Sequence, residues 1–401
     1  MNKKDKEKIS FIVLENGHVL REGEGGGDIV FKQLFRFLHE KFEIKVVLPP
    51  IARTHWEKIA NHPSILFLPD DLFPESTNYF KIGINYLWRS YKCFRLLNGI
   101  KSKHKIFLYS STETISDVLP AFFCKVIKPR QYFWIVHCHH IVPSPFQRSG
   151  GFLHNVVSYF LYQLSLLCIR SADLILAVNE KEAGKLRRLK FSNRKVEVSP
   201  PGINIEEIQG LSHVGKKRKD FSAIFVGRLH PVKGVFDLPE IWQKVIAVFP
   251  KAKIAIVGKT SPQSKKKLDN LFREEEVPKE RYRIFDFVPE RKKYTLLSQS
   301  KMFLFLDHEA GWGIAPAEAM ALGLPVVGYD IGILGNVFKK GYLKTLPFNK
   351  IKFADQVIRL LKDPNLYRKL HNGAVEQAKE LDVRKVGKKF ADLLDQAAQK
   401  E

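Results

Sequence analysis

The sequence has few cysteines and no long apolar run. Its four cysteines are widely spaced and form no CxxC pair, at Cys93, Cys124, Cys138 and Cys168. This spacing argues against a disulfide framework and against a zinc site, and it fits a reducing compartment. No stretch approaches the run of about eighteen apolar residues that a membrane-spanning helix needs. The apolar run 9–14 of the basic N-terminus is also too short for the core of a signal peptide, so we expect a cytoplasmic protein.

Acidic residues are scarce relative to basic ones. The 401 residues include 66 lysines and arginines against 42 aspartates and glutamates, which gives a formal net charge of +24. This excess favours anionic partners such as a nucleotide or a phospholipid surface. We expect no nucleic-acid partner, because the sequence contains no recognisable nucleic-acid reading module. The apolar share of 45% and the length indicate a folded protein with two domains.

Apolar runs alternate with helical patterns through both halves of the chain, which predicts an α/β fold with parallel sheets. The stretch 205–220 is polar, basic and punctuated by glycine, as linkers between domains are. We therefore expect an N-terminal Rossmann-like domain at 1–204, a linker at 205–220 and a C-terminal Rossmann-like domain at 221–401.

The stretch 307–330 reads DHEAGWGIAPAEAMALGLPVVGYD and follows an apolar run, 302–306, that predicts a buried parallel strand. Two glycines and a proline precede a helical segment in this stretch. Free amides at Gly313, Ile314 and Ala315 would point outward with the positive end of the helix dipole behind them. The pattern predicts a site for an anionic group at the start of the helix.

Glu318 opens the expected helix AEAMAL, which Gly323 should end, with Pro325 just beyond it. A carboxylate at this place suits the paired hydroxyls of a ribose, as in dinucleotide-binding folds. The alternative is a glutamate that is merely favoured in the first helical turn.

This stretch resembles the donor-binding signature E-G-F-G-x-P-x-x-E-A-M-A-x-G-x-P-V-V of the retaining family 4 glycosyltransferases (glycosyl transferases group 1), which have the GT-B fold. The family's first glutamate, a donor-sugar contact, falls at Ala310, and Glu309 stands one residue earlier. By the same resemblance, Phe287 and Val288 occupy the place where the family packs the nucleobase. The matching residues are Gly311, Trp312, Gly313, Pro316 (one place later than usual), Glu318, Ala319, Met320, Ala321, Gly323, Pro325, Val326 and Val327.

A second signal is GRLHPVKG at 227–234, where Arg228 and Lys233 flank a turn. Two cations there can neutralise a pyrophosphate leaving group as negative charge develops on it. The segment, which begins at Gly227, also matches the family's G-R-L-x-x-x-K-G at every fixed position. The alternative is a pair of solvated cations.

The N-terminal half opens with an expected strand at 9–14, a glycine loop and an expected helix at 29–42. Asp28 stands where G-x-G-x-x-G needs its last glycine, so a dinucleotide fingerprint is not supported. Gly26 and Gly27 match a family pair that lets backbone approach the donor phosphates and the acceptor. The alternative is a loop that needs positive φ.

A strand expected at 131–145 contains a histidine cluster. His137 and His139 should face one way and His140 the other, but no third ligand at useful spacing points to a metal site. The resembled family has H-D-x-x-P here, with its histidine beside the transferred sugar. That register places His139 in the catalytic position, leaves His140 in place of the aspartate, and makes His137 a second choice on the acceptor side. A structural histidine with satisfied hydrogen bonds is the alternative.

The segment 77–98 predicts a helix with an apolar, aromatic face at Phe80, Ile84, Leu87, Tyr91 and Phe94. Basic residues crowd between these positions, at Lys81, Arg89, Lys92 and Arg95. Such a helix can lie on an anionic bilayer surface, or it can be a core helix with solvated cations.

The resemblance implies a GT-B fold of two Rossmann-like domains around a nucleotide-sugar cleft, with the last helix packing back on the N-terminal domain. It implies a retaining hexosyltransferase that moves a sugar from a nucleoside-diphosphate sugar to a hydroxyl acceptor, lipid-linked or glycan, at the cytoplasmic face of a membrane. We expect no cofactor and no obligatory metal, because no pair of aspartates like that of a metal-dependent transferase is present. A catalytically silent nucleotide-sugar-binding or scaffold protein and a nucleotide-sugar epimerase remain as alternatives.

Overall fold

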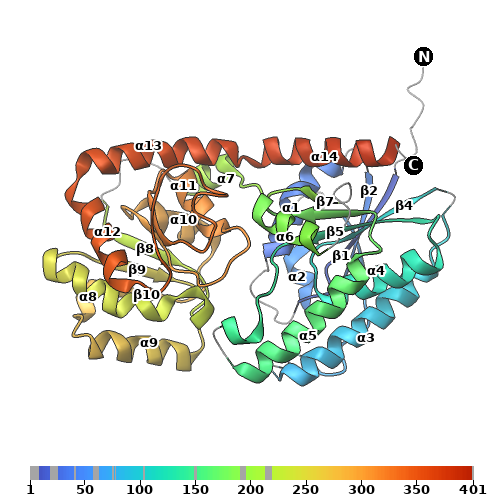
Figure 1. Ribbon diagram of the computed structural model, residues 1–401, viewed down its shortest axis with the longest axis horizontal. Coiled ribbons are helices and arrows are strands. Elements are labelled where there is room, and N and C mark those ends of the chain that lie inside the picture. Colours follow the sequence, from blue (N-terminus) through green and yellow to red (C-terminus); the bar gives the residue numbers. More distant parts are fainter. Residues whose placement is uncertain are drawn as a thin grey trace, which may run out of the picture. The chain divides into compact units, whose positions relative to one another are not determined.

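The computed structural model describes residues 9–18, 26–39, 42–56, 63–74, 76, 78–102, 104–148, 151–189, 196–212 and 219–399. The chain forms two compact units (Figure 1). The first unit comprises residues 1–200 and 386–401, and the second comprises residues 201–385. The division therefore falls after Pro200 and again inside the last helix.

The first unit is built on a seven-stranded parallel sheet of order β3-β2-β1-β4-β5-β6-β7. Its strands are β1 (Ile9–Leu14), β2 (Phe42–Leu48), β3 (Ser64–Phe67), β4 (Ile106–Ser110), β5 (Tyr132–Cys138), β6 (Leu174–Ala177) and β7 (Val196–Val198). Its helices are α1 (Gly26–Leu38), α2 (Arg53–Trp56), α3 (Tyr79–Asn98), α4 (Ile115–Ile127), α5 (Phe152–Ile169), α6 (Glu180–Arg188) and most of α14 (Val383–Gln399).

Both faces of this sheet are covered, because alternate strand residues enter two separate apolar cores. Ile12 and Trp134 pack with α3, α4 and α5 on one face, where these helices lie side by side (Figure 1). Phe11 and Phe107 pack on the other face with α1 and with Phe390 of α14. Continuous apolar strands are typical of parallel sheets buried on both sides.

The second unit is built on a six-stranded parallel sheet of order β10-β9-β8-β11-β12-β13. Its strands are β8 (Ala223–Val226), β9 (Ile254–Val257), β10 (Tyr282–Phe285), β11 (Phe303–Phe305), β12 (Val326–Tyr329) and β13 (Tyr342–Thr345). Its helices are α7 (Ile205–Leu211), α8 (Leu238–Val248), α9 (Pro262–Glu274), α10 (Glu290–Ser298), α11 (Ile314–Ala321), α12 (Lys350–Lys362) and α13 (Pro364–Glu380). Two parallel sheets confirm the expected α/β fold class.

Several boundaries differ from the sequence prediction. The helix expected at 29–42 ends at Leu38, because Phe42 already starts β2 and enters the sheet core; residues 40 and 41 lie outside the described residues. The strand expected at 131–145 ends at Cys138, so the histidines at 139 and 140 are in the loop that follows it. Within the expected linker 205–220, residues 205–211 form α7, which starts with an Asn204 cap.

The C-terminal helical segment is divided in two. Residues 381 and 382 separate α13 from α14, and Asp382 forms a parallel bridge with Ile203. From residue 386 onward, α14 belongs to the first unit, where Phe390 stacks edge-on against Tyr109. In the described part of the chain, no helix has the length and apolar character needed to cross a bilayer.

Candidate functional site

In the second unit, the loop after β8 lies against the carboxyl end of β11. Gly234 ends the turn 231–233 with φ of 63°, and a Cβ added there would lie 1.9 Å from the carbonyl oxygen of Leu306. Only glycine allows this approach. The close packing brings Lys233 beside Asp307, whose carboxylate accepts from the Lys233 ammonium.

The two predicted pyrophosphate cations, Arg228 and Lys233, differ in their surroundings. Arg228 is exposed and has no ion pair within the described residues. Lys233 is about one-quarter exposed, and its charge is shared with buried Asp307. Burial raises the pKa of Asp307, while the positive charges of Lys233 and Arg228 act to lower it. An anion at this edge would therefore meet one open cation and one that is already paired.

Helix α11 begins four residues before Glu318, three residues earlier than expected, and Gly313 caps it in a left-handed conformation with φ of 108°. In the described part of the chain, the amides of Gly313, Ile314 and Ala315 have no hydrogen-bond acceptor. Three amides free at a helix N-terminus are compatible with an anion site, and anion binding here remains a prediction. Because β8 and β11 are neighbours in a parallel sheet, these amides and Arg228 follow strand ends at the same sheet edge.

The carboxylate of Glu318 is buried and is held by two side chains of α10. Lys293 Nζ lies 2.8 Å from Glu318 Oε1, and the Tyr294 hydroxyl donates to the same oxygen at 3.0 Å. Burial and the Glu318 charge together raise the pKa of Tyr294. Glu318 is thus more than a solvated first-turn residue, and its contact with a ribose remains a prediction.

The other donor-side candidates lie in loops at this edge or beside it. Phe287 follows β10 with 58% of its surface exposed, and its amide donates to Asp286 Oδ1 at 2.7 Å. Val288 and Glu309 are half-buried. Gly227 follows β8, where a Cβ would lie 3.1 Å from the ring of Phe225. These positions are compatible with the sequence prediction but do not test it.

In the first unit, the structure brings Gly27 and His139 together. Gly26 and Gly27 are the first residues of α1, and a Cβ on Gly27 would lie 2.5 Å from Thr112 Cγ2 and 3.3 Å from His139 Nε2. Gly27 does not have positive φ. Close approach to neighbouring atoms, and not a left-handed conformation, explains why glycine is needed here.

Glu113 fixes the backbone around His139, a role that the sequence pattern does not reveal. Its two carboxylate oxygens accept the amides of His139 at 2.9 Å and His140 at 3.1 Å. The His139 ring also contacts the carbonyl of Ser111 through Nε2 at 2.9 Å. One signal in the sequence is that Glu113 closely follows the apolar segment that forms β4, which is the neighbour of β5 in the sheet.

His137 is fully buried, which favours its interpretation as a structural histidine. The Tyr109 hydroxyl lies 2.7 Å from His137 Nδ1, and the Ser199 carbonyl lies 3.0 Å from Nε2. Its ring lies against that of His139 in a tilted arrangement with centroids 4.6 Å apart, so the two histidines share a face as expected. Burial, with the nearby His139, moves the pKa of His137 well below its usual value. In the described residues, no group of three or more His, Cys, Asp or Glu side chains is placed to hold a metal ion.

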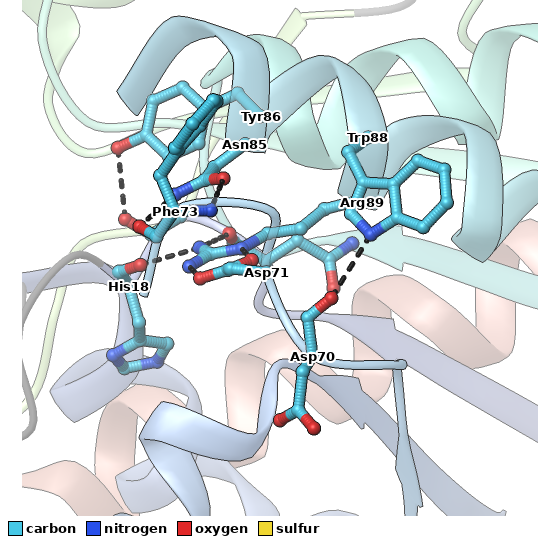
Figure 2. A network of polar contacts seen from close by, with 10 residues as sticks. His18, Asp70, Asp71, Phe73, Asn85, Tyr86, Trp88 and Arg89 are labelled. Carbon is cyan, nitrogen blue, oxygen red and sulfur yellow. Dashed lines mark hydrogen bonds and ion pairs between the residues drawn. The ribbon is translucent and has the colours of Figure 1, made fainter. Parts of the chain in front are cut away.

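Arg89 is not the exposed basic residue that the helical pattern of 77–98 suggested. Its side chain is buried, and its guanidinium forms a bidentate pair with Asp71, with Nε 2.7 Å from Oδ1 (Figure 2). It also donates to the carbonyls of Asn16 and His18, in the loop that follows β1. Tyr86 of the same helix donates to the Gly17 carbonyl at 3.1 Å. This side of α3 therefore anchors residues 16–18, which follow β1.

Comparison with solved structures defines the class of fold. Sucrose-phosphate synthase from Thermosynechococcus elongatus matches with a TM-score of 0.77 and 16% identity, over 98% of this chain and 100% of that chain. Anabaena Alr3699/HepE in complex with UDP-glucose matches with a TM-score of 0.71 and 15% identity, over 97% and 100%. WaaG, a glycosyltransferase involved in lipopolysaccharide biosynthesis, gives a TM-score of 0.70 at 13% identity, over 96% and 99%. The protein has the GT-B fold of these glycosyltransferases.

Sequence comparison then supports a family. Residues 211–377 match the family described as "Glycosyl transferases group 1", and this segment contains Arg228, Lys233, Glu309 and Glu318. An uncharacterized glycosyltransferase, MJ1059, of Methanocaldococcus jannaschii is 24% identical, over 56% of this chain and 64% of that protein. A D-inositol 3-phosphate glycosyltransferase of Streptomyces bingchenggensis is 23% identical, over 57% and 54%. The chain thus spans roughly half to two-thirds of these relatives, and the matches support the group 1 glycosyltransferase family.

Proposed function

We propose that the protein is a retaining glycosyltransferase that moves a hexosyl group from a nucleoside-diphosphate sugar to a hydroxyl acceptor. The observation that carries this proposal is the set of three free amides at Gly313–Ala315, on the same sheet edge as exposed Arg228. That edge lies within the segment that matches the group 1 family. Retention of configuration rests on the resemblance to the family 4 signature around Glu318.

The second unit supplies the groups that stabilise the leaving nucleoside diphosphate. As the bond between the anomeric carbon and the phosphate oxygen breaks, its electron pair passes to the pyrophosphate. The acceptor oxygen bonds to the anomeric carbon, and its proton passes to the departing diphosphate. Arg228 and the amides at 313–315 stabilise the negative charge of the diphosphate. Lys233 shares its positive charge between Asp307 and the pyrophosphate. Glu318 accepts hydrogen bonds from the ribose, while Phe287 and Val288 pack the base.

The first unit supplies the groups around the transferred sugar and the acceptor. The contact of His139 Nε2 with the Ser111 carbonyl requires a proton on Nε2, because a carbonyl can only accept. In the neutral ring, Nδ1 is then an acceptor for a hydroxyl hydrogen. Gly26 and Gly27 let backbone approach the substrate beside His139. We expect the reaction to need no cofactor and no metal, so prior treatment with EDTA should leave turnover unchanged.

We further propose that the acceptor is lipid-linked and that the first unit contacts an anionic membrane surface from the cytoplasmic side. Exposed aromatic and aliphatic side chains support a surface contact: Phe80 of α3 is 76% exposed and Phe160 of α5 is 68% exposed. Phe146 is 85% exposed and packs its ring against Phe152, with centroids 5.4 Å apart. Because Arg89 is buried, the cations for this contact are Lys81, Lys92 and Arg95.

Vesicle co-sedimentation tests the membrane contact. Binding should appear with anionic lipid, weaken in high salt and drop when Lys81, Lys92 and Arg95 become glutamine. Equal pelleting by the triple variant would exclude this helix as the contact, and no pelleting at low salt would exclude the membrane altogether.

A catalytically silent nucleotide-sugar-binding protein is the second candidate, and Ala310 favours it, since the family's first glutamate falls there. Donor hydrolysis separates the two possibilities. An active transferase should release nucleoside diphosphate slowly when water replaces the acceptor, and it should release it faster when a membrane extract supplies acceptor. Tight donor binding with no release under either condition would identify the silent protein.

A further inference from the structure

A broad depression of about 1610 Å³ lies at the amino ends of β8, β9 and β10. The candidate donor site follows the carboxyl ends of strands in the same sheet, so the depression is at the opposite sheet edge. Ligands of open α/β sheets usually bind at the carboxyl edge. A nucleotide-sugar held there would not fill this depression.

The lining of the depression is strongly basic. It includes nine lysine and arginine side chains and only two carboxylates, those of Asp220 and Glu280. Lys279 pairs with Asp269 at 2.6 Å, and Lys219 donates to the carbonyls of Ser298 and Ser300. The other seven cations form no ion pair with a described residue.

Helix C-termini account for only part of this charge. The last turns of α8, α10 and α12 reach the depression, and each helix end carries a charge of about −0.5, which gives about −1.5 in total. Lys219 already satisfies carbonyls at the end of α10. Several positive charges are left without a partner and repel one another, which an anionic ligand would relieve.

The arrangement of three cations indicates that the ligand carries several phosphates. Arg281 ends the turn 279–281 and Arg283 is the second residue of β10, and both arginines line the depression on either side of buried Tyr282. Lys253 lies beside them, because Ile254 pairs with Tyr282. Guanidinium groups suit bidentate contacts to phosphate, and three cations at the ends of two neighbouring strands can contact more than one phosphate group.

We propose that this basic depression binds a soluble, flexible chain of phosphate groups, at a site separate from the donor site. Its concave shape distinguishes it from a bilayer contact, which needs protruding apolar side chains. Three aromatic residues of the depression are half-buried and so do not protrude as a bilayer contact would require: Phe221, Phe249 and Phe285. Arg283 and Lys292 lie over the ring of Phe285, 4.8 Å and 5.7 Å from its centroid, which holds their charges toward the depression.

The test uses fluorescence anisotropy of end-labelled inorganic polyphosphate with the full chain, over a range of salt concentrations. The triple variant Lys253→Gln/Arg281→Gln/Arg283→Gln should bind roughly tenfold or more weakly, with a shallower dependence on salt. The control Arg368→Gln/Lys369→Gln/Lys379→Gln removes the same charge from exposed positions of α13 and should change binding less than about threefold. Neither variant should melt below the wild-type temperature.

Several outcomes would overturn the proposal. Equal weakening by the two variants would assign the binding to overall charge. Competition by nucleoside diphosphates would place the polyphosphate in the donor site. A single-stranded oligonucleotide of equal charge that binds much more tightly than polyphosphate would identify a nucleic-acid site, and binding to anionic vesicles but not to polyphosphate would identify a lipid contact. If the donor site proves inactive while the triple variant of the basic depression still loses polyphosphate binding, this inference stands and the proposed function fails.

Discussion

Three cations of this protein differ in how much of their charge a ligand can reach. Arg228 is exposed, Lys233 shares its charge with buried Asp307, and Arg89 is enclosed by Asp71 and two carbonyl groups. Only the first offers a full charge to an incoming pyrophosphate. Sequence pattern cannot separate these cases, because pairing depends on residues far away along the chain.

Arg228→Ala should therefore reduce turnover by roughly 10²- to 10³-fold, the usual scale for one lost group that stabilises developing negative charge. The unfolding free energy should barely change, because the side chain is exposed. Steady-state kinetics at subsaturating donor measure the effect, with Arg368→Ala on α13 as the matched exposed control. Wild-type rates in Arg228→Ala would remove this arginine from the site.

Glu318→Gln should weaken nucleoside-diphosphate binding by roughly 1.5–3 kcal/mol, because a charge-assisted pair of hydrogen bonds to the ribose is lost. The structure adds a second effect: Lys293 loses its partner, so the unliganded protein should also unfold more easily. Calorimetry of the ligand separates the two effects, with Lys293→Met as the control that disturbs the same pair and keeps the carboxylate. Unchanged affinity in Glu318→Gln would leave Glu318 a structural residue.

His137 should make the protein sensitive to acid. Its pKa is lowered in the folded state, so between that value and about 6.5 the unfolded chain binds a proton that the folded protein does not. Stability is therefore fully present above pH about 6.5, and it falls by up to about 1.4 kcal/mol per pH unit below that. Denaturant unfolding from about pH 7 to about pH 5 should show a shallower loss for His137→Gln than for wild type or His139→Gln. Parallel slopes for all three proteins would contradict this assignment.

At the scale of elements, the sequence predicts the parts that depend on local pattern. Strand β1, helix α3 and the Gly323 stop after α11 follow from apolar runs, periodicity and glycine. Sequence pattern does not identify β3 and β13, which are edge strands of their sheets and are only partly buried. The contacts of Glu113, and the Glu318 pair with Lys293, could not be predicted because they join different elements.

The anchor between α3 and the loop after β1 should be strongly stabilising. Arg89→Gln would leave Asp71 buried without its partner and should lower the unfolding free energy by about 3–5 kcal/mol. Arg95→Gln, an exposed change on the same helix, should cost less than about 0.5 kcal/mol. Denaturant unfolding measures both variants. Similar small losses would mean that the Arg89 network contributes little to the fold.

At the scale of the whole molecule, the excess positive charge is distributed over more than one surface. The donor edge of the second sheet has one open cation and three free amides, while the opposite edge has seven unpaired cations among its described residues. The first unit presents exposed aromatic residues together with Lys81, Lys92 and Arg95. Composition alone gives the sum of these charges, and only the fold separates them into distinct surfaces.

The central claim is that the second unit holds a nucleoside diphosphate at the carboxyl edge of its sheet. Titration calorimetry with UDP, GDP, ADP and CMP tests it most directly. The proteins to compare are the wild type, Arg228→Ala, Glu318→Gln and the triple variant of the basic depression, Lys253→Gln/Arg281→Gln/Arg283→Gln. We predict that a nucleoside diphosphate binds, that Arg228→Ala and Glu318→Gln both weaken this binding, and that the triple variant of the basic depression binds it like wild type. The account would be contradicted if none of the four nucleotides bound, or if binding were lost only in the triple variant of the basic depression.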